Sequence, residues 1–407
     1  MVNVAVLGYG TVGSGVVEVL NTNKEIIKQK AGDELKVKYV LDLREFEGDP
    51  VQEILVHDYD VILKDKDVKI IAEAMGGEEP AYTFTKNALL AGKSVCTSNK
   101  ELVAKHGAEL IEIAKKNNAN YFFEASVGGG IPIIRPLIQC LVADEITEIS
   151  GILNGTTNYI LTEMSEKGSA FEDVLKDAQD KGYAERNPEA DVEGYDACRK
   201  IAILTSLVTG AQVDFEDIHT EGITKITEAD FKYAKAMKAS IKLLGISRKV
   251  DGKFYSMVAP FFVKANNPLY SINGVFNGIL VHGNMVDDVM FYGRGAGKRP
   301  TASAVVSDVV DAAKNLGKHV PVKWDQAKSE LGQFGDCKSK FFVRMKDKGL
   351  DDDQMTTIIE AFGDVLYVKA DGVTDELAFI TNEIKEEEFA EHLKKFEDVY
   401  SVIRVDF

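Results

Sequence analysis

The sequence of 407 residues predicts an α/β protein built from three parts. Short apolar runs alternate with helical segments over residues 1–130, which predicts a parallel sheet covered by helices on both faces. Residues 131–300 change to a strand, a polar loop and a helix, followed by hairpin-like strands, which predicts a mixed α+β domain. The order of elements after residue 338 is βαββαβ, the ferredoxin-like pattern.

The first part begins with the apolar run VNVAVLG at residues 2–8. A helical segment follows at residues 11–32 and closes with a glycine. Three further strands are predicted in LKVKYVLDLR, VKIIAEAMGG and KSVCTSNK (residues 35–44, 68–77 and 93–100). A helix at about residues 300–320 is expected to pack back on this domain.

The middle part opens with EITEISGILNGTTNYILTEM (residues 145–164), which predicts a strand, a loop and a helix. A helical and loop region is expected from there to about residue 250. Strands follow it at residues 253–264, 274–284 and 287–297. The tail, residues 338–407, predicts strands at 340–345, 366–370, 376–382 and 401–407 and helices at 352–362 and 386–396. We expect this small domain to serve binding or association.

Composition excludes several classes of function. The formal net charge of −17 argues against binding to nucleic acid or to an anionic membrane surface. The apolar runs are strand-length, so no membrane span is expected. The four cysteines (Cys96, Cys140, Cys198 and Cys337) lack metal-ligand spacing and fit reduced thiols. Because no export signal precedes the first strand, a cytoplasmic location is expected.

A glycine-rich turn joins the first strand to the first helix. The stretch GYGTVGSG places Gly8, Gly10 and Gly13 in GxGxxG spacing. Gly8 permits a tight turn, Gly10 lets the backbone approach a pyrophosphate, and Gly13 lets helix and strand pack closely. The helix N-terminus offers N–H groups to phosphates. The alternative is a turn without a ligand, but the strand and helix on either side favour a Rossmann-type dinucleotide site.

The end of the second strand bears on the choice of dinucleotide. Asp42 stands where an acid can accept from a ribose 2′-hydroxyl, as in NAD sites. Arg44 is close enough in the chain to meet the 2′-phosphate of NADP instead. The two residues point to opposite cofactors, so both remain open at this stage.

Three polar loops each allow two interpretations. TSNK (residues 97–100) ends a strand where ligands of such sheets bind, although a lysine there is more often a solvated charge. EASVGGGIP (residues 124–132) is either a hinge between domains, which local features favour, or a cradle of carbonyls for a cation. NGTTNY (residues 154–159) gathers hydroxyls and amides before a helix, which capping alone explains.

An acidic loop leads into an apolar helix. GYAERNPEADVEGYD (residues 182–196) contains five acids within twelve residues: Glu185, Glu189, Asp191, Glu193 and Asp196. Such a run is usually a solvated loop, but it could also hold a substrate amine. In the helix that follows, Asp196 and Lys200 lie one turn apart on a segment that is otherwise almost wholly apolar. An exposed pair would be an ordinary helix ion pair worth about 0.2–0.5 kcal/mol; at the mouth of a buried helix it indicates a catalytic pair.

Taken together, six motifs closely resemble the homoserine dehydrogenase family over residues 1–320: GYGTVGSG, TSNKEL, EASVGGGIPII, GILNGTTNYIL, GYAERNPEADVEGYDACRKIAIL and GRGAGKRPTASAVVSD. The tail resembles an ACT domain, a ligand-sensing module. The resemblance implies reversible oxidation of L-homoserine to L-aspartate 4-semialdehyde with NAD or NADP, on the way to threonine, methionine and isoleucine. It also implies a homodimer or homotetramer, and feedback inhibition by an amino-acid effector, most readily threonine.

The resemblance assigns roles to residues by position. Lys200 matches the proton donor, Asp196 its substrate-binding partner and Glu185 the acid that holds the substrate amine. Lys100 matches a lysine at nicotinamide and substrate, an alternative acid/base. Residues that match cofactor contacts are Gly10, Thr11, Val12, Gly182 and Gly297. Residues that match a monovalent-cation (sodium) site are Glu124, Val127, Gly129 and Ile131. Leu41 departs from the family, since NADP-preferring members often have arginine there.

The chemistry explains why a lysine is needed. Reduction of an aldehyde by hydride leaves an alkoxide, which must receive a proton from an acid within hydrogen-bond reach. Burial lowers the pKa of a lysine, whereas a neighbouring carboxylate raises it, so we expect Asp196 to orient the substrate hydroxyl as well. Two other readings are a related oxidoreductase acting on another β-semialdehyde or amino acid, and an amino-acid sensor on an inactive enzyme scaffold. The presence of Lys100, Glu185 and the Asp196–Lys200 pair argues against the sensor.

Overall fold

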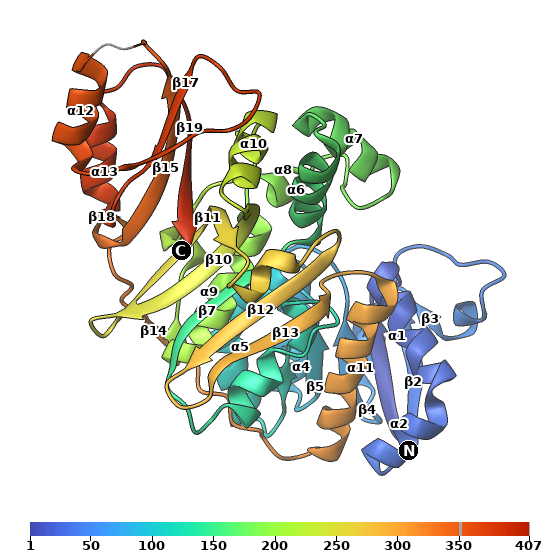
Figure 1. Ribbon diagram of the computed structural model, residues 1–407. Helices are drawn as coiled ribbons and strands as arrows, with labels where there is room; N and C mark the ends of the chain where they lie inside the picture. The colour runs from blue at the N-terminus through green and yellow to red at the C-terminus, as the bar shows by residue number, and fades with distance from the viewer. Residues whose placement is uncertain (350–351, 407) are drawn as a thin grey trace. The chain divides into compact units, whose positions relative to one another are not determined.

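The computed structural model describes residues 1–349 and 352–406. These residues form two compact units (Figure 1). The first unit comprises residues 1–145, 202–215 and 291–329, and the second comprises residues 146–201, 216–290 and 330–407. The sequence predicts three domains; most of the predicted middle domain shares one compact unit with the tail, while its residues 131–145, 202–215 and 291–300 lie in the first unit.

The first unit contains a six-stranded sheet in the order β3-β2-β1-β4-β5-β6, with all neighbours parallel. The strands are β1 (Val2–Leu7), β2 (Leu35–Leu41), β3 (Leu55–Val56), β4 (Val68–Glu73), β5 (Ser94–Thr97) and β6 (Tyr121–Phe122). Its helices are α1 (Thr11–Thr22), α2 (Lys24–Ala31), α3 (Tyr59–Lys64), α4 (Ala81–Leu90), α5 (Lys100–Lys116) and α11 (Lys298–Lys314). A short pair, β8 (Ala211–Gln212) and β14 (Asp325–Lys328), completes the regular strands. The predicted doubly wound sheet is confirmed.

Two details of this unit differ from or sharpen the sequence predictions. The single helix expected at residues 11–32 is two helices, because Asn23 leaves the helical conformation (φ −104°, ψ 21°) and begins α2. The helix predicted near residue 300 does pack back: α11 contacts α1, and a Cβ added to Gly15 would lie 2.9 Å from the Cβ of Ala302. Glycine at this position therefore lets the two helices approach closely.

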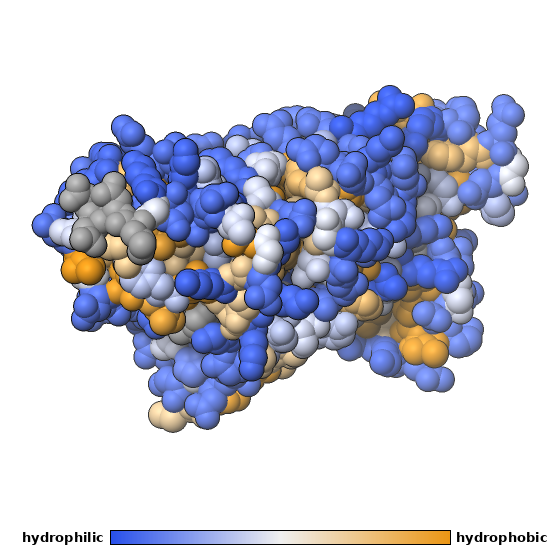
Figure 2. Space-filling view, turned by 45° about the horizontal axis from the view of Figure 1, so that its top comes forward, coloured by the Kyte–Doolittle hydropathy of each residue, from blue (hydrophilic) through white to orange (hydrophobic). Residues whose placement is uncertain are grey.

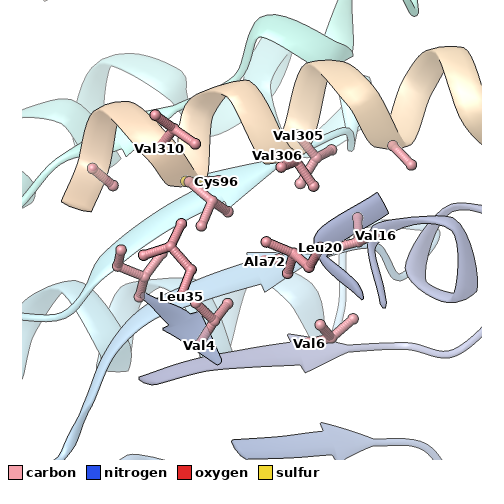
Figure 3. Close-up of a cluster of buried hydrophobic side chains, with 14 of the residues drawn as sticks. Val4, Val6, Val16, Leu20, Leu35, Ala72, Cys96, Val305, Val306 and Val310 are labelled. Atoms are coloured by element: carbon pink, nitrogen blue, oxygen red, sulfur yellow. The ribbon is translucent and has the colours of Figure 1, made fainter. Parts of the chain in front are cut away.

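The core of the first unit lies between the sheet and these two helices (Figure 3). Val4 and Val6 of β1 meet Val16 of α1 and Val305 of α11, and all four are fully buried. Cys96 of β5 belongs to the same cluster, as an apolar side chain would. None of the four cysteines forms a disulfide in the described part of the chain.

The second unit is built on one large sheet in the order β13-β12-β7-β10-β11-β19-β15-β17-β16. The strands from the middle of the chain are β7 (Ile146–Ile152), β9 (His219–Thr220), β10 (Ala239–Val250), β11 (Lys253–Lys264), β12 (Phe276–Gly283) and β13 (Asp287–Arg294). The helices are α6 (Gly155–Lys167), α7 (Phe171–Asp180), α8 (Glu189–Val192), α9 (Tyr195–Thr209) and α10 (Glu228–Ala236), of which α9 runs on from residue 202 into the first unit. Strand β10 lies in a region expected to be helix and loop. Seven consecutive residues of it, 241–247, are buried, so it lacks the alternation that marks a half-exposed strand.

The tail has the predicted βαββαβ order with one extra short strand. Its elements are β15 (Lys338–Lys346), α12 (Asp352–Phe362), β16 (Leu366–Val368), β17 (Glu376–Ile380), β18 (Ile384–Lys385), α13 (Glu386–Leu393) and β19 (Val399–Asp406). The spatial order β19-β15-β17-β16 and the two helices on one side of these strands give the ferredoxin-like arrangement (Figure 1). Phe407, at the end of the last predicted strand, lies outside the described residues. The tail is not separate, because β19 pairs in parallel with β11.

Short helical turns connect several of these elements: η1 (Pro50–Ile54), η2 (Glu124–Ser126), η3 (Pro136–Cys140), η4 (Phe215–Asp217), η5 (Pro268–Ser271) and η6 (Phe334–Asp336). None of the helices in the described part of the chain is long and apolar enough to cross a membrane. The face in Figure 2 is mostly hydrophilic, in keeping with the high charge of the sequence.

Candidate active site

The glycine turn of the first unit has the geometry that a dinucleotide site requires. Gly8 has φ 86°, and a Cβ there would lie 3.1 Å from the carbonyl oxygen of Ala74. A Cβ on Gly10 would meet nothing within 4 Å, so the space in front of α1 is open. A Cβ on Gly13 would lie 1.8 Å from the carbonyl oxygen of Gly8, which excludes any larger residue. No side chain caps α1, and its first turn holds no acid, so the N–H groups of Thr11 and its successors suit an anion.

The ribose end of the site is marked by Asp42, directly after β2. Its Oδ2 accepts a hydrogen bond of 2.8 Å from the backbone N–H of Tyr9, within the glycine turn. Arg44 donates from Nε and Nη2 to the same carboxylate at 2.9 Å. The Arg44 guanidinium and these backbone donors hold the pKa of Asp42 well below its usual range, although partial burial opposes them. The two residues that pointed to different cofactors are therefore paired with each other.

Lys100 is the first residue of α5, at the carboxyl end of β5, and it is half-buried. Both polar atoms of the side-chain amide of its neighbour Asn99 are hydrogen-bonded. Oδ1 accepts from Leu102 N at 3.1 Å, and Nδ2 donates to the Gly77 carbonyl at 2.7 Å. The position of Lys100 is thus set by the cap of α5 and by the loop after β4.

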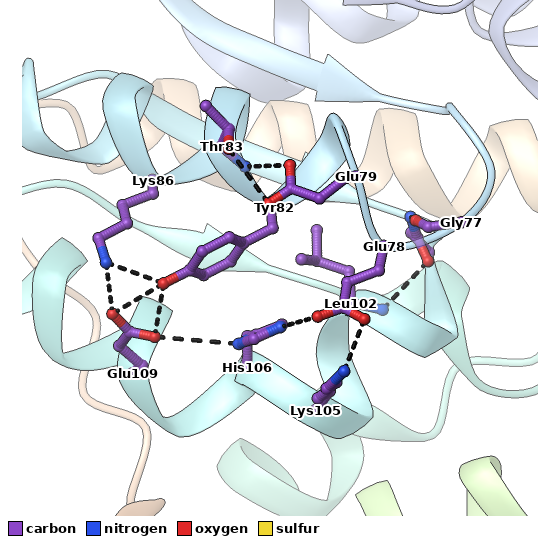
Figure 4. A network of polar contacts seen from close by, with 11 residues as sticks. Gly77, Glu78, Glu79, Tyr82, Thr83, Lys86, Leu102, Lys105, His106 and Glu109 are labelled. Carbon is purple, nitrogen blue, oxygen red and sulfur yellow. Dashed lines mark hydrogen bonds and ion pairs between the residues drawn. The ribbon is translucent and has the colours of Figure 1, made fainter.

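A polar network holds the loop after β4 against α5 (Figure 4). Glu78 of that loop accepts from Lys105 Nζ at 2.6 Å and lies 2.8 Å from His106 Nε2. The His106 ring stacks on Tyr82 of α4 at 4.1 Å. The Tyr82 hydroxyl donates to Glu109. The network joins α4 and α5 around the turn that carries Lys100.

The second unit contains the buried pair predicted on α9. Lys200 Nζ lies 2.7 Å from Asp196 Oδ2 and donates to the Leu153 carbonyl oxygen, also at 2.7 Å. The two residues are 8% and 2% exposed, so the pair is not an ordinary surface ion pair. Ile201 beyond it is fully buried. The expectation of a charged pair on a buried helix is confirmed.

Asn154 is part of this centre, and its role was missed in the sequence. Its Oδ1 accepts from Thr157 N at 2.9 Å and so caps α6, as expected for the NGTTNY loop. Its Nδ2 donates to Asp196 Oδ2 at 2.8 Å and to Asp191 Oδ1 at 2.7 Å. An asparagine whose oxygen caps a helix still has its amide N–H₂ group to donate, and this is the feature of the sequence that could have pointed to the contact with Asp196.

The remaining acids of the loop are not drawn into this centre. Glu185 lies exposed between α7 and α8, and its backbone carbonyl accepts from Gln179 Nε2 at 3.1 Å. Gly182, before it, has φ 73°, which favours glycine. Gly297 belongs to the first unit, where it precedes α11 with φ 116°.

In the loop EASVGGGIP, the side chain of Glu124 is taken up by the backbone of the following residues. Both oxygens of Glu124 accept backbone N–H groups, from Ile133, Ile134 and Arg135 at 2.6–2.8 Å. Among the described residues no cluster of His, Cys, Asp or Glu could hold a metal ion. The cation site predicted at Glu124, Val127, Gly129 and Ile131 stays a prediction. Gly128 and Gly129 have positive φ angles, which favour glycine, and the hinge between domains stays a prediction.

A Rossmann-type unit with an open glycine turn, and a buried lysine–carboxylate pair in the second unit, define the class: a nicotinamide-dinucleotide oxidoreductase. The comparisons refine it. A model of the homoserine dehydrogenase NAD-binding domain matches residues 8–124, and a homoserine dehydrogenase model matches residues 132–310.

Curated relatives agree over three quarters of the chain or more. The homoserine dehydrogenase of Bacillus subtilis is 37% identical over 418 residues, 99% of this chain and 96% of the relative. That of Synechocystis is 45% identical over 317 residues, 76% of this chain and 73% of the relative. The chain therefore belongs to the homoserine dehydrogenase family, and it is an oxidoreductase that interconverts homoserine and aspartate semialdehyde.

Solved structures agree as well. A homoserine dehydrogenase from Thiobacillus denitrificans, 33% identical, superposes with a TM-score of 0.90 and covers 100% of this chain and 98% of that one. The enzyme from S. aureus at pH 7.5, 31% identical, gives 0.82 with 100% and 98% coverage. A hyperthermophilic archaeal enzyme in complex with NADPH, 29% identical, gives 0.67 and covers 79% of this chain and 99% of that one.

Proposed function

We propose that Lys200 is the proton donor and acceptor of the reaction. The observation that supports this is the burial of its ammonium between Asp196 and the Leu153 carbonyl, each 2.7 Å away. A bound nicotinamide supplies or accepts the hydride. In the reducing direction the Lys200 ammonium gives a proton to the alkoxide oxygen, and in the oxidising direction its neutral amine takes the proton from the hydroxyl.

Asp196 orients both lysine and substrate. Its Oδ2 already receives Lys200 Nζ and Asn154 Nδ2, which fixes the rotamer of the carboxylate. A carboxylate held in this way can also accept from the homoserine hydroxyl. The geometry of the lysine then does not depend on substrate binding, and little reorganisation accompanies proton transfer.

Two further residues are assigned to the substrate by the resemblance. Glu185 is proposed to hold the substrate amine; its exposed side chain on the loop between α7 and α8 is accessible to a ligand. Lys100 is proposed to contact nicotinamide and substrate from the start of α5. Lys100 is also the second candidate for the proton donor.

The test of Lys200 is the initial rate at 340 nm with L-homoserine. Lys200→Ala is expected to lower kcat by about 100-fold or more, the usual contribution of a positioned acid–base group. The control is Lys232→Ala, which breaks an exposed pair of the same i,i+4 spacing with Glu228 on α10. Full activity in Lys200→Ala together with a large loss in Lys100→Ala would transfer the role to Lys100.

For the cofactor, we favour NAD over NADP. The Asp42 carboxylate, held by Tyr9 N–H, can accept from a ribose 2′-hydroxyl, whereas a 2′-phosphate would meet its negative charge. Arg44 is occupied by Asp42, and Leu41 stands where NADP-preferring members of the family often have arginine. The glycine turn and α1, with residues Gly8 to Gly13, hold the pyrophosphate, and Gly182 and Gly297 are proposed as further contacts.

We also propose a sodium ion in the loop at residues 124–131. Carbonyl oxygens of Glu124, Val127, Gly129 and Ile131 would be its ligands, since the Glu124 side chain is already satisfied by backbone N–H groups. Its role would be to hold the loop. The test is to measure the midpoint of thermal unfolding in NaCl and in choline chloride at equal ionic strength. Equal midpoints in the two salts would contradict the proposed sodium site.

The tail is proposed to be an ACT domain that responds to an amino-acid effector, with threonine as the first candidate. Its ferredoxin-like strand order supports the assignment. Initial rates of the full chain with and without L-threonine test it, and unchanged rates would exclude threonine as the effector. A homodimer or homotetramer is proposed as well, because the hairpin of β12 and β13 exposes Met285, Met290 and Tyr292. Light scattering that gives a monomer at micromolar concentration would contradict it.

A further inference from the structure

A buried acid that the reaction does not use directly lies at the carboxyl end of the first unit's sheet. Glu73 is the last residue of β4, and its side chain has no exposed surface. The next residue, Ala74, donates its N–H to the Leu7 carbonyl at 2.9 Å, beside the glycine turn. Glu73 therefore lies at the edge where the parallel strands end and ligands of such sheets bind.

Glu73 joins two turns that are far apart in the sequence. Its Oε1 accepts from the backbone N–H of Met75 at 2.7 Å, in the turn after β4. Its Oε2 bonds to the hydroxyl of Thr97, the last residue of β5. The Thr97 hydroxyl oxygen in turn accepts from the backbone N–H of Asn99 at 2.9 Å. The chain of contacts therefore runs from β4 through Thr97 to the cap of α5, and Lys100 follows directly.

An acid is an unfavourable choice for such a place unless its oxygens are needed. Burial raises the pKa of Glu73 to about 7, and the hydrogen bonds from Thr97 and Met75 only partly offset this. Leucine or methionine would fill the same volume without desolvation of a carboxyl group. What an apolar side chain could not do is accept from both the Met75 N–H and the Thr97 hydroxyl. An acid is therefore favoured at this position, because its two oxygens accept hydrogen bonds from these two donors.

We propose that Glu73 is a positioning residue: through Thr97 and Asn99 it fixes the turn that presents Lys100 to substrate and nicotinamide. Glu73 itself touches neither. The inference rests on the proposed role of Lys100. Because misplacement of a reacting group by about 1 Å can lower a rate by about 100-fold, a loosened turn is sufficient to affect turnover.

The test removes one hydroxyl. Thr97→Val keeps the shape of the side chain and deletes the link between Glu73 and Asn99; kcat is expected to fall by about tenfold or more, with the Kd for the dinucleotide within about twofold. Thr97→Ser restores the hydroxyl and is expected to recover most of the rate. The matched control is Thr85→Val in α4, because Thr85 is also fully buried but its hydroxyl has no hydrogen-bond partner among the described residues. Glu73→Gln is the second variant if Thr97→Val does not fold: its amide cannot accept from both donors, so kcat should fall there as well.

Lys100→Ala and the double variant Lys100→Ala/Thr97→Val separate the two proposals. If Lys100→Ala lowers kcat and Thr97→Val adds no further loss in that background, the hydroxyl acts through Lys100 as proposed. If Thr97→Val alone keeps wild-type kcat while Lys100→Ala does not, the positioning role is wrong and the role of Lys100 stands. An equal loss from Thr97→Val in both backgrounds also overturns it, as a merely structural effect. Full activity in Lys100→Ala would overturn the role of Lys100 itself, and with it this inference.

Discussion

At the scale of single residues, the proposed mechanism depends on where two charges are placed on one buried helix. Spacing alone identified Asp196 and Lys200, because i,i+4 residues share a helix face and the rest of that face is apolar. Spacing could not identify Asn154, which is 42 residues away in the chain and is brought to Asp196 by the fold. Glu73 was missed for a related reason: an acid that ends an apolar strand looks like the start of a loop until its burial is known.

Asp42 is proposed to set the preference for NAD over NADP, and its replacement tests this. Asp42→Ala removes the charge that a 2′-phosphate would meet and frees Arg44 from its ion pair. A hydrogen bond to a charged group is worth about 1.5–3 kcal/mol, so the ratio of kcat/KM for NADP to that for NAD should rise by about tenfold or more. Arg44→Gln should move the ratio in the opposite direction or leave it unchanged. A rise in the ratio in Arg44→Gln would show that the ribose binds elsewhere.

The buried carboxyl of Glu73 predicts a pH dependence of stability. Its pKa is about 7 in the folded chain against 4.5 for the ordinary group, so the folded state binds the proton more tightly than the unfolded state. Unfolding then releases a proton between these pH values, and stability falls as pH rises from about 4.5 to 7, by up to about 3 kcal/mol. Glu73→Gln, which does not titrate, should lack this loss. Urea unfolding of both proteins at pH 5 and pH 8 measures the difference; parallel changes in the two would contradict the assignment.

At the scale of elements, prediction succeeded where local pattern and fold agree. The parallel strands, the glycine turn and the βαββαβ tail were all readable, because each has its own periodicity and boundaries. Strand β10 could not be predicted, because burial on both of its faces removes the alternation of apolar and polar residues. Lys242 within it is buried, although in the sequence its charge resembles the exposed charge of a helix. The break between α1 and α2 has no proline or glycine to mark it.

Helix α6 gives a test that separates stability from activity. Asn154→Ala removes both the cap of α6 and the contact with Asp196, whereas Asn154→Ser keeps a cap oxygen and loses only the contact. The alanine variant should lose about 1 kcal/mol of stability and the serine variant much less. Both should lose activity to a similar degree, since both release the Asp196 carboxylate. If serine restores the rate together with the stability, Asn154 serves only as a cap.

At the scale of the second unit, the tail belongs to the same sheet as β7, β10 and β11. Phe342 of β15 packs against Phe262 of β11 at 5.0 Å and against Tyr233 of α10 at 5.2 Å between ring centres. Removal of residues 338–407 would therefore uncover the edge of β11 and these rings. Effects of an amino-acid effector are better measured on the full chain, because a truncated chain would report the loss of the sheet as well.

Arg404, like Arg344, is a buried arginine of the tail that pairs with an acid outside it, and it gives the last prediction. Its buried guanidinium forms two hydrogen bonds with Glu386 of α13, at 2.7 and 2.8 Å, and two with Glu221, which follows β9, at 2.9 Å. Arg404→Met keeps much of the apolar stem but leaves two carboxylates with no cation between them. Breaking a buried pair from one side costs about 3–5 kcal/mol, so we expect a loss of this size in urea unfolding. Lys385→Met is the control, because its pair with Asp336 is half-exposed and should contribute about 1 kcal/mol or less. If Arg404→Met is no less stable than Lys385→Met, the β11–β19 pairing and the aromatic contacts hold the tail without the arginine. If it is less stable by several kcal/mol, the charge network joins the tail to the strand beside β10. Strand β10 in turn contacts the residues around Lys200: a Cβ added to its Gly245 would lie 2.9 Å from the side chain of Leu153, and the Leu153 carbonyl accepts a hydrogen bond from Lys200.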